Sequence, residues 1–334
     1  MKKGLLAGLI ILLVLLLAGG IFLVNRTEEV PETAGQQVHV SPTPTPVKKT
    51  GAQNTAAPDS AGLSRMYNIL LVGVDNQDKN NMEVRGNADG IIIATINPET
   101  RELIFTSFMR DTRVRVRDST YDKLTNVYHT GGIELLSETL EQNFEVPIDY
   151  YAIFNYVDIA DIVDAIGGVE VELTSTEIMF MESKIASVSW LTGSDYKENV
   201  IDPDQVGPTT LNGVQAAAYA RIRPSEGGYD AGRTERGQEI ITAIMSKALQ
   251  LGTSDMLQFA SVFYEKIETD VPDDVFLELG LNASELRRYT KISDRIPLDG
   301  AYESSSTGSG YYAIPDFEVN NKHLHDSIYN GIHN

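Results

Sequence analysis

Four arginines lie close together in the stretch Ala217–Gln238, AAYARIRPSEGGYDAGRTERGQ. They are Arg221, Arg223, Arg233 and Arg236. Because the whole chain has a formal net charge of −20, such a basic cluster requires an anionic partner, inside or outside the protein. The planar guanidinium binds phosphate and carboxylate with directional hydrogen bonds. The cluster therefore predicts an anion site. The alternative is a solvated helix face on which Asp230, Glu235 and Glu239 pair with the arginines.

Two aspartates flank the first two apolar runs of the folded region. Asp75 follows Tyr67–Val74 (YNILLVGV), and Asp89 precedes Gly90–Asn97 (GIIIATIN). If both runs are neighbouring strands, these carboxylates meet at one edge of the sheet, where α/β proteins tend to bind ligands. Two carboxylates without histidine or thiol suit a hard cation such as Mg²⁺, with Mn²⁺ as a substitute. The alternative is that each aspartate only caps a turn or a strand end, which is the more common role of aspartate.

Further cations follow the third apolar run, Glu102–Met109. Arg110 comes directly after it, and Lys123 lies in the stretch YDKLTNVYHTGG. Each taken alone could be a surface ion pair of little value. Converging with Arg85 and the arginine cluster at an edge that binds a metal, they would suit a diphosphate. Phosphoryl transfer needs mainly positioning and charge stabilisation, which arginines and a metal ion supply.

Composition excludes several other functions. A strongly acidic chain has no net basic charge with which to bind nucleic acid. The chain contains no cysteine, so it has no disulfide, thiol nucleophile or zinc–thiolate site. It also lacks a phosphate loop, a Gly-x-Ser-x-Gly elbow and histidines paired at metal spacing. We interpret His129 as structural and as the only histidine of the folded part, and the single tryptophan, Trp190, as a core residue.

The pattern of apolar residues predicts an α/β fold, a single domain with a central mixed β-sheet flanked by helices. Besides the three runs above, the sequence predicts strands over 150–154 and 169–173 and helices over 132–142, 157–166, 213–221, 234–251, 256–267 and 272–278. Alternation of strands with helices favours a buried sheet covered by helices.

The chain divides into four parts by composition. Residues 1–24 are two lysines and an uncharged apolar run long enough to cross a bilayer, with the N-terminus expected in the cytoplasm. A cleavable signal peptide is the alternative, but the apolar run continues past its small residues, which favours a retained anchor. Residues 25–64 are a Pro-, Thr- and Ala-rich linker. Residues 65–299 form the extracytoplasmic domain, and 300–334 are expected to be a polar C-terminal tail whose last residues are frayed.

An ordered series of segments resembles the LytR-CpsA-Psr family. The segments are NILLVGVDN, Gly86–Asn97, SFMRDT, DKLTNVYHTGG, IDYYAIFN, IVDAIGGVEVEL, LNGVQAAAYARIR and DAGRTER, and they extend from about Tyr67 to Leu251. The resemblance implies a membrane-anchored phosphotransferase that moves a glycopolymer, of the wall teichoic acid or capsular type, from polyprenyl pyrophosphate to peptidoglycan or another envelope acceptor. A binding module without turnover and a hydrolase of the same lipid-linked diphosphate are the alternatives.

The resemblance also implies roles for individual residues. Asp75 and Asp89 match the family's Mg²⁺ ligands. The residues that match its catalytic and diphosphate-binding positions are Arg110, Lys123, Arg221, Arg223 and Arg233, with Arg85 and Arg236 as further diphosphate ligands. Two departures stand out besides Met109, where the family usually has proline. Asn87 replaces an arginine two residues before the second aspartate, and Gly237 stands where a glutamine normally follows Arg236, so that Gln238 comes one residue late.

Overall fold

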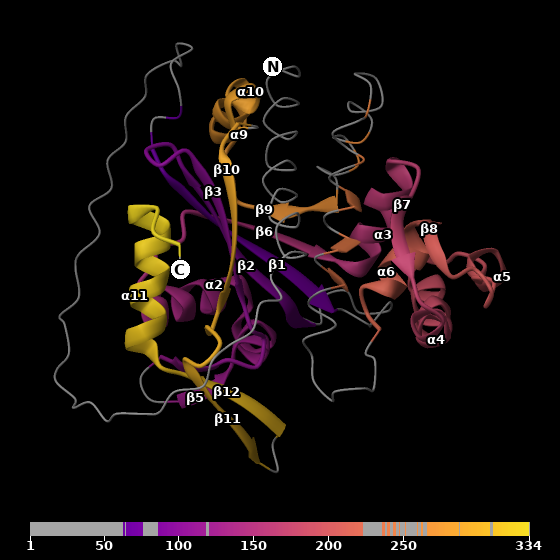
Figure 1. The fold of residues 1–334 in the computed structure, drawn as a ribbon, viewed down its shortest axis with the longest axis horizontal. Helices are drawn as coiled ribbons and strands as arrows, with labels where there is room; N and C mark the ends of the chain where they lie inside the picture. The colour runs from indigo at the N-terminus through magenta and orange to yellow at the C-terminus, as the bar shows by residue number, and fades with distance from the viewer. Residues whose placement is uncertain are drawn as a thin grey trace.

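The computed structural model describes residues 63–333, apart from 64, 76–85, 118–119, 223–235, parts of 238–265, 287 and 308–309. At its centre is a six-stranded mixed sheet (Figure 1). In spatial order its strands are β10 (Thr290–Ile296), β3 (Glu102–Phe108), β2 (Asn87–Asn97), β1 (Tyr67–Asp75), β6 (Tyr150–Asn155) and β9 (Glu268–Thr269). β1 pairs antiparallel with β2 and parallel with β6. The predicted α/β class and mixed sheet are confirmed.

Strand β1 is apolar throughout because both of its faces are covered. Leu70 and Val72 point into one core and Ile69 and Leu71 into the other, as the alternation of side chains along a strand requires. A strand buried on both faces reads as a continuous apolar run. This is why YNILLVGV is the most easily recognised element of the sequence.

Helices cover both faces of the sheet (Figure 1). On one face lie α2 (Leu124–Phe144) and α11 (Phe317–Asn330), and on the other lies α3 (Tyr156–Ala165), against which α4 (Ser175–Thr192) and α6 (Gly213–Tyr219) pack. Shorter helices are α5 (Tyr196–Asn199), α9 (Asp273–Leu281) and α10 (Ala283–Leu286), and the two-stranded ribbons are β4 (Arg113–Val116) with β5 (Thr120–Lys123), β7 (Val169–Leu173) with β8 (Gly207–Leu211), and β11 (Tyr302–Thr307) with β12 (Gly310–Pro315).

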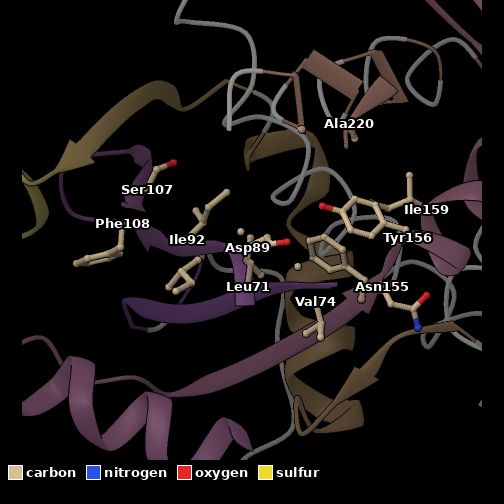
Figure 2. Close-up of a pocket in the computed structure, with 15 residues that line it drawn as sticks. Leu71, Val74, Asp89, Ile92, Ser107, Phe108, Asn155, Tyr156, Ile159 and Ala220 are labelled. Atoms are coloured by element: carbon tan, nitrogen blue, oxygen red, sulfur yellow. The ribbon is translucent and has the colours of Figure 1, made fainter. Parts of the chain in front are cut away.

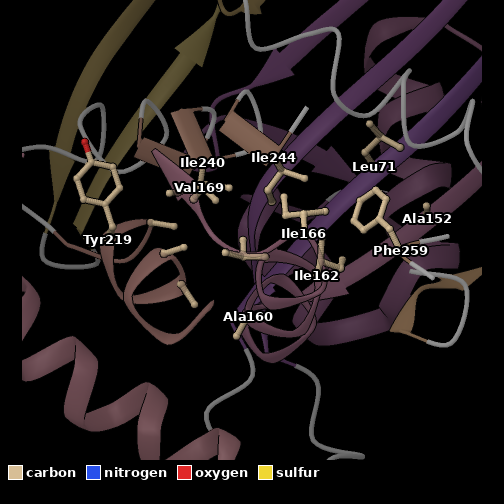
Figure 3. Close-up of a cluster of buried hydrophobic side chains, with 14 of the residues drawn as sticks. Leu71, Ala152, Ala160, Ile162, Ile166, Val169, Tyr219, Ile240, Ile244 and Phe259 are labelled. Atoms are coloured by element: carbon tan, nitrogen blue, oxygen red, sulfur yellow. The ribbon is translucent and has the colours of Figure 1, made fainter. Parts of the chain in front are cut away.

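Helices α3 and α6 pack unusually close to one another. A Cβ added to Gly213, the first residue of α6, would lie 2.0 Å from the carbonyl oxygen of Ala160 in α3. The Gly213 backbone N–H also donates to Asp164 Oδ1 at 2.7 Å. Figure 3 shows the apolar cluster behind this contact, with Ile162 of α3 and Ile166, which directly follows α3, lying between Val169 and Phe259. The packing holds the amino end of α6 against α3, and the first arginine of the basic cluster, Arg221, follows two residues after the helix ends.

The C-terminal segment 300–334 is part of the folded domain, so the prediction of a polar tail with frayed last residues was wrong. It forms the β11–β12 hairpin and α11, and Leu324 and Ile328 of α11 are fully buried against the sheet. The polar composition of this segment does not exclude a packed helix, because one apolar stripe along a helix is enough for it to pack on the sheet. Strand β10, also unpredicted, lies parallel to β3 at the edge of the sheet.

His323 of α11 is also part of the folded domain, which corrects the expectation that only His129 is. Its Nε2 lies 2.6 Å from Asp294 Oδ2 of β10, and both side chains are largely buried. The hydrogen bond with Asp294 raises the pKa of His323 although burial opposes it. A pKa raised by folding stabilises the native state fully below the ordinary histidine pKa of about 6.5 and loses this contribution as pH rises through the raised value.

We therefore expect the stability advantage of the native chain over a His323→Gln variant to be largest below about pH 6 and to shrink towards pH 8. Glutamine keeps a hydrogen-bond donor but cannot acquire charge. Thermal melting of both chains across this range measures the difference. An advantage that stays constant or grows with pH would contradict the assignment of a protonated His323.

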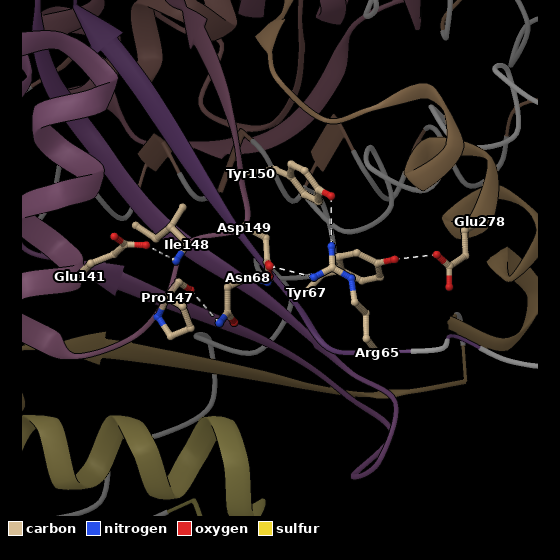
Figure 4. A network of polar contacts seen from close by, with 9 residues as sticks. All are labelled: Arg65, Tyr67, Asn68, Glu141, Pro147, Ile148, Asp149, Tyr150 and Glu278. Atoms are coloured by element: carbon tan, nitrogen blue, oxygen red, sulfur yellow. Dashed lines mark hydrogen bonds and ion pairs between the residues drawn. The ribbon is translucent and has the colours of Figure 1, made fainter. Parts of the chain in front are cut away.

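A polar network fixes the start of β1 (Figure 4). Arg65 donates to Asp149 at 3.0 Å and lies over the ring of Tyr67, with its guanidinium carbon 4.4 Å from the ring centre. Tyr67 in turn donates to Glu278 at 2.6 Å. Burial and this bond to a carboxylate raise the pKa of Tyr67. The network ties β1 to the segment before β6 and to α9 at the end of the sheet where the domain begins.

Several other predictions differ from the structure. Trp190, expected in the core, lies on α4 with 53% of its surface exposed, and His129 is exposed on α2. The helix predicted over 132–142 begins at Leu124 and has a non-helical residue at Gly132. No described helix has the length and apolar character of a membrane span. The proposed anchor (1–24) and the linker (25–64, apart from Leu63) lie outside the described residues.

Candidate active site

A β-bulge places the two predicted metal-binding carboxylates at the same edge of the sheet. Between β1 and β2 the register shifts, so that Gly73 is opposite Gly90 but Val74 is opposite Ala88. Asp89 is the extra residue, and a bulge of this kind redirects a side chain. Asp75 pairs with Asn87 two residues away. The predicted proximity of Asp75 and Asp89 is therefore present in the fold.

Asp89 forms a largely buried ion pair with Arg110. Arg110 follows β3, and the loop that carries it is fixed by the first turn of α2. The backbone N–H groups of Leu124 and Thr125 donate to the carbonyl oxygens of Thr112 and Arg110, at 3.1 and 3.0 Å. First-turn N–H groups of a helix have no acceptor within the helix. The loop supplies these acceptors, and this holds Arg110 at the edge of the sheet.

Met109 makes a contact that the family's usual proline could not. Its backbone N–H donates to the carbonyl oxygen of Ile296 at the end of β10, at 2.8 Å. Proline has no N–H. The substitution therefore replaces a rigid residue by a hydrogen bond to the neighbouring strand.

Arg221 is almost completely buried, with 5% of its side chain exposed. Its Nη2 donates to Asp75 Oδ1 at 3.1 Å, and its guanidinium carbon lies 4.8 Å from the centre of the Tyr156 ring. Within the described part of the chain, the buried Nη1 has no hydrogen-bond acceptor. A buried donor without an acceptor costs about 1–3 kcal/mol, so this atom indicates the position of an external acceptor.

Lys123 does not line the pocket, but its ion pair with Asp111 connects it to Arg110. Its Nζ lies 2.6 Å from Asp111 Oδ1 and 4.9 Å from the centre of the Tyr312 ring in β12. Asp111 Oδ2 lies 3.8 Å from Arg110 Nε. The structure thus links Lys123, Asp111, Arg110 and Asp89 in a row of alternating charges.

Arg236 is held by α4. Its Nε donates to Glu177 Oε1 at 2.9 Å, and its guanidinium lies over the ring of Tyr219. Burial alone would raise the pKa of Glu177, but hydrogen bonds from Thr174 and Arg236 outweigh it and hold the pKa below its usual range. Glu177 also completes the capping box of α4 with Thr174, so one carboxylate fixes both a helix start and an arginine.

An apolar pocket opens beside these charges on the α3 side of the sheet (Figure 2). It encloses about 700 Å³, including space that is open to solvent. Its lining includes Leu71, Ile92, Ile159 and Ala220, with Asp89 among the few polar groups. Figure 2 shows the Asp89 carboxylate and the Tyr156 hydroxyl both directed towards the middle of the pocket.

The first residues of α3 form the wall that carries Tyr156. Asn155 accepts from the backbone N–H groups of Val157 and Asp158, and Asp158 accepts from that of Asn155. This capping box fixes the turn. Burial raises the pKa of Asp158 to about 6. Sequence reasoning missed Tyr156, although it directly follows the segment IDYYAIFN. It also missed the roles of Asp111 and Glu177; the readable signal for Glu177 was its three-residue spacing from Thr174.

Three of the predicted site residues lie outside the described residues, namely Arg85, Arg223 and Arg233. Of the other six, the four cations each pair with a carboxylate, and Asp75 and Asp89 are two of these carboxylates. Of the two departures, Asn87 is opposite Asp75 in the strand pair, and Gly237 lines the pocket.

The carboxylates fit a magnesium ion that is partly held by substrate. Asp75 and Asp89 provide the oxygen ligands that Mg²⁺ takes, usually one or two carboxylates completed by waters and phosphate oxygens. The described residues hold no group of three or more His, Cys, Asp or Glu side chains that could bind a metal. A metal bound by Asp75 and Asp89 would therefore need further ligands, such as waters or phosphate oxygens.

Comparison with known proteins identifies relatives along most of the chain. The model of the LytR_cpsA_psr family matches residues 36–324. The polyisoprenyl-teichoic acid–peptidoglycan teichoic acid transferase TagU of Bacillus anthracis is 28% identical over 322 residues, 95% of this chain and 94% of the relative. The enzyme of the same name from Enterococcus faecalis is 29% identical over 218 residues, 65% of each chain.

Solved structures share the fold. Protein gbs0355 from Streptococcus agalactiae superposes with a TM-score of 0.65 at 23% identity, covering 80% of this chain and 88% of that one. The LytR-CPS2A-psr family protein YwtF (TagT) with bound octaprenyl pyrophosphate lipid superposes with a TM-score of 0.56 at 21% identity, covering 83% and 94%. TagT bound to LI-WTA gives 0.58 at 21% identity, with the same coverage.

Proposed function

The chain belongs to the LytR-CpsA-Psr family, and on that premise we propose that it transfers a glycopolymer from polyprenyl pyrophosphate to peptidoglycan or a similar envelope acceptor. Its curated relatives are named as transferases that join teichoic acid to peptidoglycan. The proposed donor is a polyprenyl pyrophosphate that carries a teichoic acid or a capsular polysaccharide.

The buried Nη1 of Arg221 is the observation that carries this proposal. Arg221 is hydrogen-bonded to Asp75 and lies over the ring of Tyr156. These two contacts fix the orientation of the guanidinium and therefore the position of Nη1. Phosphate and carboxylate oxygens are the acceptors to which a guanidinium makes its strongest hydrogen bonds. Arg110, fixed by Asp89 on the neighbouring strand, is a second guanidinium at the same edge. Two arginines positioned in this way suit the two phosphates of a diphosphate.

The apolar pocket suits the lipid part of such a donor. Its wall of Leu71, Ile92 and Ile159 offers apolar surface directly beside Asp89. Burial of apolar chain surface is worth about 25 cal/mol per Å², and a prenyl chain offers far more apolar surface to such a wall than a nucleotide diphosphate does. The juxtaposition of apolar pocket and arginines therefore favours a prenyl diphosphate over a soluble one.

The transfer forms one bond and breaks one. A hydroxyl oxygen of the acceptor attacks the phosphorus next to the glycan, the bridging P–O bond of the diphosphate breaks, and polyprenyl phosphate leaves. The proton of the hydroxyl passes to a site carboxylate or to the departing phosphate. Arg110 and Arg221 hold the phosphates and balance the charge that develops on them. Asp75 and Asp89 would hold Mg²⁺, which neutralises phosphate charge when bound.

The proposal also assigns a location to the domain. The apolar run within residues 1–24 would anchor the chain in the membrane with the N-terminus in the cytoplasm. The linker 25–64 would hold the domain outside the membrane, within reach of a lipid-linked donor.

The test uses the full-length chain in detergent micelles with a labelled polyprenyl-pyrophosphoryl saccharide. Reactions contain or lack peptidoglycan, in Mg²⁺ or in chelator. We expect label to move to the acceptor only when Mg²⁺ is present. Label released without acceptor would instead indicate a hydrolase. Lipid bound but unchanged under every condition would contradict any enzymatic role and leave a binding module.

A further inference from the structure

The outer face of the β4–β5 ribbon carries a basic, aromatic stripe. Arg113 is opposite Lys123 in the strand pair, and Arg115 is opposite Tyr121. Directly opposed residues share a face, and so do residues two apart on one strand. Val114, between the two arginines, is fully buried in the core, so the face that carries the arginines is the outer one. Arg115 is exposed, and Tyr121 has 55% of its surface exposed.

The two arginines of this stripe have no carboxylate partner among the described residues. The guanidinium carbon of Arg113 lies 4.5 Å from the centre of the Tyr121 ring. Among the described residues, this is the only charged or aromatic side chain that the Arg113 side chain contacts. No ion pair of Arg115 occurs there either. Two neighbouring arginines that form no ion pair with a described carboxylate create a local positive potential. Such a potential is unusual in a chain with a net charge of −20.

The ribbon is a rigid support for these side chains. Asn143 of α2 accepts from the backbone N–H of Arg115 and donates to its carbonyl oxygen, at 2.9 and 2.8 Å. At the far end of β4, Arg117 pairs with Glu138 of α2 at 3.3 Å. A fixed backbone holds the attachment points of the arginine side chains in place, which lowers the entropic cost of binding.

The stripe begins at the candidate active site. Lys123, at its inner end, is bound to Asp111, which in turn contacts Arg110. Arg115 and Tyr121 lie two residue pairs further along the ribbon towards its turn. The β11–β12 hairpin lies alongside, with the Tyr312 ring near Lys123 and a backbone bridge between Thr112 and Ala313 (Figure 1). A chain that leaves the diphosphate in this direction would run along the stripe.

We propose that the outer face of β4–β5 binds the polyanionic part of the donor, a phosphodiester-linked glycopolymer, through Arg113 and Arg115. This inference rests on the proposed function and specifies its substrate class as an anionic polymer rather than a neutral polysaccharide. Residues two apart on a strand are about 7 Å apart, a spacing that lets consecutive phosphates of an extended poly(polyol phosphate) meet consecutive arginines. The ring of Tyr121 offers an apolar surface for the polyol or sugar between them.

The test measures binding of a fluorescent, lipid-free poly(glycerol phosphate) to the full-length chain in phosphatidylcholine nanodiscs. The variant Arg113→Gln/Arg115→Gln keeps hydrogen-bond donors but removes both charges. We expect its affinity to fall about tenfold, and the slope of log affinity against log salt between about 50 and 200 mM to decrease by roughly 1 to 2. Arg117→Gln is the matched control: it lies on the same ribbon but is paired with Glu138, and its affinity should stay within about twofold of the native value.

Several outcomes would overturn the inference. One is an affinity for poly(glycerol phosphate) that is equal in the native chain and the double variant. Another is a loss of affinity in Arg117→Gln as large as that in the double variant. A double variant that loses attraction to anionic phosphatidylglycerol vesicles but not to the polymer would assign the stripe to lipid head groups instead. Transfer from a lipid-linked saccharide by the native chain, measured separately, distinguishes failure of this inference from failure of the transferase assignment.

Discussion

Replacing Arg221 by alanine is expected to lower the rate of glycopolymer transfer by a factor on the order of 10³ or more at saturating donor. Arg221 is buried, bound to Asp75 and aimed by Tyr156, so neither water nor a neighbouring side chain can take its place next to the phosphates. Arg110→Ala should have an effect of the same order, because Arg110 is held in the same way by Asp89.

Two further variants separate charge from geometry in this experiment. Arg221→Lys retains the charge but not the planar fork, and it should recover only part of the lost rate. Arg101→Ala removes an exposed arginine that pairs with Glu285 and should change the rate by less than about twofold. Circular dichroism and thermal melting establish that each variant is folded. A folded Arg221→Ala or Arg110→Ala chain with native turnover would refute the assignment of the site.

Replacing Gly213 by alanine is expected to destabilise the domain by about 3 kcal/mol, at or above the usual upper range for an overpacked site. The added Cβ would lie 2.0 Å from the carbonyl oxygen of Ala160. Backbone atoms cannot rotate out of the way, so α6 must move away from α3 and weaken the bond from Gly213 N–H to Asp164. For a domain of this size we expect a fall in melting temperature of about 6–12 °C.

The same variant should also lose activity at temperatures where it remains folded. Ala220 lines the pocket and Arg221 follows it directly after the end of α6, so a shift of α6 displaces both. For stability, Gly237→Ala is the matched control, because among the described residues a Cβ there would meet no atom within 4 Å, and alanine in a helix is favoured by about 1 kcal/mol over glycine. A Gly213→Ala chain as stable as the Gly237→Ala chain would contradict the close packing of α3 on α6.

Elements with a strong local pattern of apolar residues were the ones that the sequence predicted well. Strands β1, β3 and β7 and helix α3 agree with the predictions to within about two residues, because continuous or periodic apolar residues are a local property. Helix α4 was missed, although Thr174 and Glu177 form the capping box that starts it. Strand β10 was missed because its sequence, TKISDRI, has few apolar residues, as suits a strand at the edge of the sheet.

The candidate site was predicted in its residue types but not in its contacts. Asp75, Asp89, Arg110 and Arg221 were recognised because they follow or precede apolar runs in an order typical of one family. Their pairing partners depend on a bulge at Asp89 and on loops that meet only in the folded chain. No local sequence pattern could have predicted the ion pair between Asp111 and Lys123. The two residues meet because β4 pairs with β5 and both strands pack against α2.

The amino-acid sequence by itself determined the alternation of strands and helices, the acidic balance, the order of the family's segments and the identity of the charged residues. These follow from local composition and spacing. Only the tertiary structure decided that segment 300–334 packs on the sheet, that apolar residues beside Asp89 line a pocket instead of filling a core, and that Arg113 and Arg115 share an outer face with Lys123. The physical reason is that these properties depend on contacts between segments distant in sequence, and an apolar or charged side chain reads the same in the sequence whichever neighbour it meets.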